Sequence, residues 1–102
     1  MERMRFRKGR HAAASGWRRR PNNRRREHLE RLGRAVEARS RYECRVVERR
    51  GVPVLHVEGG DALEVLCDYR DGRWWFVWAD GREIASVADF YGAVRVICGV
   101  RA

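Results

Sequence analysis

The chain has 102 residues, of which 44% are hydrophobic and 10% aromatic, so it is long enough for one small domain with a packed core. No uncharged apolar run approaches the roughly 20 residues that a membrane span needs, so we expect no membrane segment. The formal net charge is +9, yet residues 1–26 carry +10 and residues 27–102 carry −1. The basic character therefore belongs to the N-terminal segment and does not mark the rest as a nucleic-acid binder.

Residues 1–22 are predicted to form a disordered arginine-rich arm, followed by a single domain over residues 23–102. Arginines alternate there with small residues without a sustained helical or strand period, and like charges repel. Because arginine neutralises phosphate and tryptophan stacks on bases, residues 1–26 are a candidate nucleic-acid site. The alternative is a solvated tail. The candidate contacts are Trp17, Arg18, Arg19, Arg20, Arg24, Arg25 and Arg26.

A helix is predicted over residues 24–39. Leu29, Leu32 and Val36 recur at spacings of three and four and form one apolar face, while arginine and glutamate fill the other. An asparagine in the preceding segment, residues 21–23, is expected to cap the helix.

Five short segments with strand patterns follow, separated by glycine-containing turns. The predicted strands are residues 42–46, 52–58, 63–69, 74–79 and 82–85. The predicted turns are residues 49–51, 59–61, 71–72 and 80–81. In the second strand Leu55 and Val57 are the expected core residues, and in the third Leu63, Val65 and Cys67 share one face.

A second amphipathic helix is predicted over residues 87–98, where Ser86 and Asp89 resemble a capping box with Asp in place of Glu. The order α-β-β-β-β-(β)-α with tight hairpins predicts an α+β fold. In it an antiparallel β-meander of four to five strands is flanked by an N-terminal and a C-terminal helix that pack on one face.

The strand at residues 74–79 is apolar on both faces. Trp74, Phe76 and Trp78 share one face and are expected beneath the helices, while Trp75 and Val77 share the other. Leu66, on the neighbouring strand, also points to this second face. Either another segment covers Trp75, Val77 and Leu66, or they form a contact surface for a protein partner or a second copy of the chain.

No catalytic, cofactor-binding or metal-binding motif stands out, so we expect no cofactor and no metal. Cys44, Cys67 and Cys98 stand far apart without C-x-x-C spacing, as expected for reduced thiols in a cytoplasmic protein. His56 faces away from the core strand residues and has no titratable partner at a recognisable spacing, so an exposed surface histidine is expected.

The chain resembles a group of small actinobacterial proteins of unknown function, over about residues 27–100. The resemblance rests on Cys67-Asp68, Trp74-Trp75-Phe76-x-Trp78, Gly81-x-x-Ile84-Ala85 and a closing amphipathic helix. Where that group commonly has proline after the isoleucine, this chain has Ala85. Such proteins are often encoded beside helix-turn-helix regulators, which implies a regulatory or partner-binding role.

We therefore expect a non-enzymatic interaction module that binds a protein partner through its aromatic sheet face, as an accessory to a transcription regulator. One alternative is nucleic-acid binding through the basic N-terminal arm, residues 1–26. A second is a small toxin-like ribonuclease, although residues 27–102 lack the basic surface that such an enzyme needs.

Overall fold

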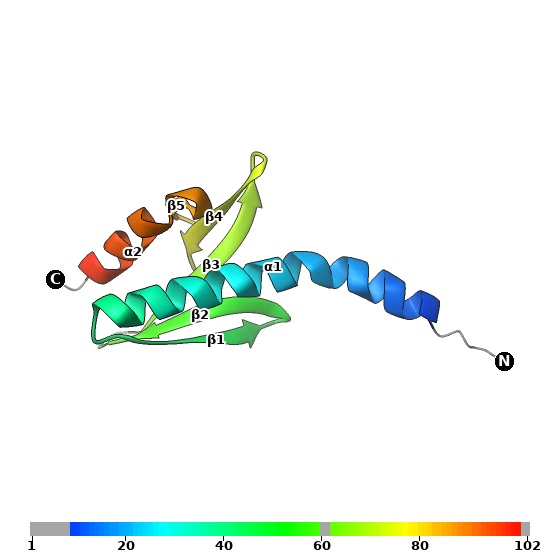
Figure 1. The fold of residues 1–102 in the computed structure, drawn as a ribbon, viewed down its shortest axis with the longest axis horizontal. Coiled ribbons are helices and arrows are strands. Elements are labelled where there is room, and N and C mark those ends of the chain that lie inside the picture. The colour runs from blue at the N-terminus through cyan, green and yellow to red at the C-terminus, as the bar shows by residue number, and fades with distance from the viewer. Residues whose placement is uncertain (1–8, 60–61, 101–102) are drawn as a thin grey trace.

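The computed structural model describes residues 9–59 and 62–100, which form two helices and one five-stranded sheet (Figure 1). The elements are helix α1 (Gly9–Arg39), strands β1 (Glu43–Arg49), β2 (Val52–Glu58), β3 (Leu63–Arg70), β4 (Arg73–Trp78) and β5 (Glu83–Ser86), the 3-10 turn η1 (Val87–Asp89) and helix α2 (Phe90–Gly99). Each strand pairs with its neighbour in the chain and runs antiparallel to it. The predicted α+β meander between two helices is confirmed.

The two-residue hairpin turns are set by residues that accept a positive φ. Arg50 and Gly51 join β1 to β2 with φ of 56° and 79°, and Asp71 and Gly72 join β3 to β4 with φ of 51° and 80°. Positive φ at both central positions matches the twist of the flanking strands, which is why such turns favour Asp and Gly. In the predicted turn between β2 and β3, residues 60–61 lie outside the described part of the chain.

Helix α1 begins at Gly9, so the predicted start at residue 24 is wrong. Residues 9–22, for which the sequence predicts disorder, continue the helical backbone, and residues 1–8 lie outside the described residues. Arginine and alanine are strong helix formers, and lengthening a helix that is already held against the sheet needs no new nucleus. The division of the chain into an arm and a domain stays a prediction.

The expected asparagine cap before α1 is also wrong, because the segment that was to hold it lies inside the helix. Pro21 removes one backbone hydrogen bond there without ending the helix. Asn22 instead donates from Nδ2 to the carbonyl oxygen of Gly51 at 3.2 Å, which ties α1 to the turn between β1 and β2. Within the described residues, no helix is both long enough and apolar enough to cross a bilayer.

The hydrophobic core lies between the two helices and one face of the sheet. Leu29, Leu32 and Val36 of α1 are fully buried, as their spacing predicts. They meet alternate residues of the strands and one face of α2, namely Leu55, Val57, Val65, Cys67, Phe76, Phe90, Ala93, Val94 and Ile97. Trp74 and Trp78 pack against this core on either side of Phe76, so the predicted inward face of β4 is confirmed.

Close approach of α1 to the sheet depends on Gly33. A Cβ atom at this position would lie 3.0 Å from Cδ1 of Leu55 and 3.2 Å from Cβ of Cys44. The helix therefore sits directly on β1 and β2, and its N-terminal part extends past the ends of these strands (Figure 1).

Two successive caps, rather than the predicted capping box, start the C-terminal helix. Ser86 Oγ accepts a hydrogen bond from the backbone N–H of Ala88 at 3.1 Å and so caps η1. Asp89 Oδ1 accepts from the N–H of Gly92 at 3.3 Å and caps α2, which begins at Phe90 rather than at residue 87. The shorter Asp caps the turn that follows it instead of reaching back to residue 86.

Candidate functional site

We call the side of the sheet turned away from both helices the open face. One apolar row crosses it, with Val47 of β1 opposite Val54 of β2, and Leu66 of β3 opposite Val77 of β4. Val54 and Val77 are only 3% and 2% exposed, although neither belongs to the core cluster beneath the helices. Side chains of the open face itself must therefore shield them.

The first shield is an ion pair between Arg49 of β1 and Glu64 of β3, with 2.6 Å between Nη2 and Oε2. Because β2 lies between these strands, the arginine side chain passes over it. Arg49 pairs with Val52 and Glu64 pairs with His56, so the residue of β2 midway between them on this face is Val54. The hydrogen bond from Arg49 holds the pKa of the Glu64 carboxyl below its ordinary value.

The second shield is Arg70 at the end of β3. Its Nη1 donates to the carbonyl oxygen of Gly81 at 3.2 Å and lies 3.5 Å from Oε2 of Glu83 on β5. Strand β4 lies between β3 and β5, so Arg70 crosses the side of β4 that carries Trp75 and Val77. Long arginine stems can cover apolar surface while their charged heads stay in water.

The predicted contact residues on this face are brought together but are not equally accessible. Leu66 is paired with Val77, and Trp75 lies two residues along the same strand. Trp75 and Leu66 are half-buried, whereas Val77 is only 2% exposed, so of the two alternatives left open by the sequence the covered one holds for Val77. Nε1 of Trp75 is buried and has no hydrogen-bond partner. The contact surface is therefore narrower than the sequence suggests.

Antiparallel pairing brings Glu64 of β3 beside His56, and Glu58 lies two residues further along the same strand as His56. Its Nδ1 lies 3.6 Å from Oε2 of Glu64, and its Nε2 lies 4.0 Å from Oε1 of Glu58. A histidine between two carboxylates is suited to proton transfer. However, its side chain is only 15% exposed, so the prediction of an exposed histidine is wrong and a substrate would reach little of the ring. Nδ1 of His56 is buried and makes no hydrogen bond within the described residues, so its approach to Glu64 is a packing contact.

Two of the predicted nucleic-acid contacts face the domain instead. Nε of Arg25 donates to the carbonyl oxygen of Cys67 at 3.0 Å, and its guanidinium lies 5.5 Å from the ring centroid of Trp74. Nη2 of Arg26 is 2.9 Å from Oε2 of Glu48. Arg25 and Arg26 therefore anchor α1 to the sheet, a role that the sequence pattern did not reveal.

The other predicted contacts lie on α1 before this anchor. Arg24, the residue immediately before Arg25, is exposed. Trp17 and the three arginines at residues 18–20 lie on α1 before Asn22, the residue that contacts the turn between β1 and β2. Residues 9–26 contain seven arginines and no carboxylate. We call residues 9–26 the basic segment.

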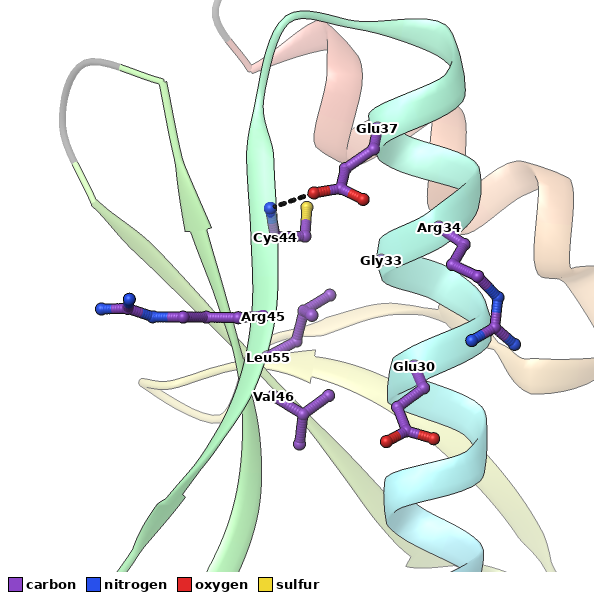
Figure 2. A pocket seen from close by; sticks show the side chains of 8 residues that line it. All are labelled: Glu30, Gly33, Arg34, Glu37, Cys44, Arg45, Val46 and Leu55. Carbon is purple, nitrogen blue, oxygen red and sulfur yellow. Dashed lines mark hydrogen bonds between the residues drawn. The ribbon is translucent and has the colours of Figure 1, made fainter.

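A groove of about 270 Å³ lies between α1 and β1 (Figure 2). It is lined by Glu30, Gly33, Arg34, Glu37, Cys44, Arg45, Val46 and Leu55. Glu37 Oε2 accepts a hydrogen bond from the backbone N–H of Cys44 at 2.8 Å, and the side chain of Arg45 points away from the helix (Figure 2). Burial raises the pKa of the Cys44 thiol to about 11, which disfavours the reactive thiolate.

Within the described residues, no group of three or more His, Cys, Asp or Glu side chains is placed to hold a metal ion. No protein-family model, curated protein or solved structure matches the chain.

Proposed function

We propose that this chain is a non-enzymatic nucleic-acid-binding module that uses the basic segment of α1. The observation that carries the proposal is the continuous helical backbone from Gly9 to Arg39, whose first part extends past the strands (Figure 1). That part carries many arginines without a single carboxylate. A helical stretch with this concentration of positive charge favours a polyanion as its partner.

The expected interaction is dominated by phosphate. Arginine makes bidentate contacts with phosphate oxygens, and release of condensed counterions makes binding depend steeply on salt. A single α-helix also fits the width of the major groove of B-DNA. Trp17 adds an aromatic surface on which a base can stack. Because Arg25 and Arg26 hold the sheet, the phosphate contacts fall to Arg24 and the arginines at residues 18–20.

The test is a salt titration of binding to a labelled duplex and to a labelled single strand, followed by fluorescence anisotropy. Replacing residues 18–20 by glutamine should weaken binding at least tenfold and lower the slope of log Kd against log salt by roughly 2–3, as expected for three lost phosphate contacts. The matched control replaces Arg41, Arg73 and Arg95, which are exposed and lie outside the basic segment, by glutamine. Equal losses in both triple variants would show that only net charge matters, and absence of binding at low salt would refute the proposal.

A second candidate function is binding of a protein partner through the open face, as an accessory to a transcription regulator. The observation that favours it is that Trp75 and Leu66 are still partly exposed. No helix or strand of the described residues packs over them on this side of the sheet. A regulator encoded beside this chain should bind it and lose at least tenfold in affinity when Trp75 is replaced by alanine. Tyr91→Ala on α2, which removes an aromatic residue that is 57% exposed, is the control. Equal affinities for wild type and Trp75→Ala would exclude this surface.

A further inference from the structure

Strand β1 forms one edge of the sheet, and the register shows which of its backbone groups face outward. Arg49 and Val52 flank a two-residue turn, and such flanking residues exchange both backbone hydrogen bonds. Alternate residues of β1 therefore bond to β2, while Cys44, Val46 and Glu48 direct N–H and C=O away from it. The bond from the N–H of Cys44 to Glu37, rather than to a strand, agrees with this assignment (Figure 2).

The two edges of the sheet are protected to different degrees. Strand β5 has four residues, contains an irregularity in its pairing and runs directly into η1 and α2. Strand β1 has seven residues, contains no proline and is paired along its whole length with β2. Among the described residues no strand pairs with its outer side. A long, regular edge of this kind is a template for another strand.

We propose that the outer edge of β1 pairs with the same edge of a second copy, antiparallel and centred on Val46, to form a continuous ten-stranded sheet. In this register Val46 lies opposite Val46 of the second copy, and Cys44 lies opposite Glu48 of the second copy. All three outward-facing residues of each strand then exchange backbone hydrogen bonds.

The charges along β1 favour this register over its neighbours. When the pair is centred on Val46, Glu43 of each copy lies opposite Arg49 of the other, which gives two pairs of opposite charge. Opposite charges in facing positions stabilise a sheet. Sliding the pair by one hydrogen-bonded step in either direction brings Arg45 opposite Arg45, or Arg45 opposite Arg49, of the second copy. Arg49 already contacts Glu64, but its side chain is 54% exposed and can contact a second carboxylate.

The groove beside β1 provides room for the incoming side chains. It lies between β1 and the helix beside it, and the side chains of Val46 and Leu55 point into the space between them (Figure 2). The side chain of Val46 from the second copy would enter next to Val46 on this side. Pairing must displace Glu37 from the N–H of Cys44, so Glu37 competes with the incoming strand and keeps the association reversible.

The proposal is independent of nucleic acid and is tested on the purified full chain by sedimentation equilibrium. Wild type should populate a dimer in the micromolar to millimolar range, and Glu37→Ala should shift the equilibrium toward dimer several-fold. Val46→Pro removes an outward N–H without removing a bond to β2, so it should yield a folded monomer, with folding checked by circular dichroism. A folded Val46→Pro variant that dimerises like wild type would overturn the proposal.

A mixing experiment decides the register even if Val46→Pro fails to fold. Glu43→Arg and Arg49→Glu each create like-charge pairs in their own dimers and should each weaken self-association at least several-fold. An equimolar mixture restores two opposite-charge pairs, so it should form a heterodimer at least as tightly as wild type. Failure of the mixture to associate better than either variant, or a wild type that stays monomeric at millimolar concentration, would overturn the proposal.

Discussion

The guanidinium of Arg70 on β3 reaches across β4 to the carboxylate of Glu83 on β5, with 3.5 Å between Nη1 and Oε2. Trp75 and Val77 lie on the side of β4 that it crosses. On the far side of the sheet from the helices, arginine side chains thus cover apolar residues. The same arrangement recurs where Arg49 passes over Val54 to Glu64.

Removing Arg70 should therefore expose Trp75. Arg70→Ala is expected to lower the free energy of unfolding by about 1 kcal/mol, because it loses a part-exposed ion pair and the packing of the arginine stem. It should also increase acrylamide quenching of tryptophan fluorescence. Arg73→Ala is the matched control, since Arg73 faces Arg70 across the hairpin and is exposed. Identical quenching in both variants would contradict a covering role for Arg70.

Substitution of Gly33 should show how closely α1 lies on the sheet. Gly33→Ala gains about 1 kcal/mol of helix propensity but must push aside Leu55, so its net effect on stability should be small. Gly33→Leu has no room between α1 and the sheet and should cost about 2–3 kcal/mol. Urea unfolding of the two variants measures the difference, and a Gly33→Leu variant as stable as wild type would contradict the structure.

As the pH is lowered, the titration of His28 should destabilise the fold at a higher pH than the titration of Glu64. Burial lowers the pKa of His28 below its ordinary value of 6.5, with Arg24 adding to the effect, and its Nε2 is buried without a hydrogen-bond partner. A lowered folded-state pKa means that its contribution to stability is complete above 6.5 and is lost as the pH falls below that value. The Glu64 contribution is lost only below its ordinary value of 4.5.

Thermal unfolding of wild type and His28→Phe across the acid range tests this order. The phenylalanine keeps the ring beside Trp74, whose centroid is 5.8 Å from that of His28, and removes the titrating group. The variant should lose less stability than wild type between about pH 7 and about pH 5. Parallel curves for the two proteins would exclude His28 as the source.

Two of the thiols should resist alkylation in the folded protein. Burial raises the pKa of Cys67 to about 12 and that of Cys44 to about 11, so little thiolate exists at about pH 8. Both should react with iodoacetamide much more slowly than in urea, with peptide mass spectrometry identifying the labelled residue. Rapid labelling of Cys67 in native protein would be incompatible with its place in the core.

Local sequence patterns predicted the helices and strands well wherever buried apolar residues recur at a regular spacing. The spacing of Leu29, Leu32 and Val36 identified the buried stripe of α1, and alternation in β4 identified the inward face of Phe76. The beginning of α1 was predicted wrongly because the sequence of residues 9–22 has no apolar residues at sustained helical spacing, which is the signal by which the later part of the helix was recognised.

Sequence alone determined that this protein is an antiparallel meander between two helices, that Trp75 and Val77 lie on the face away from them, and that its charge is concentrated at the N-terminus. Those properties follow from side-chain period, turn residues and composition, which are local. Only the tertiary structure decided that Arg49 and Arg70 cover that face, that Glu64 lies beside His56, and that Arg25 and Arg26 contact the sheet. These contacts join residues on different strands or between helix and sheet, so they depend on register and packing, which no local pattern specifies.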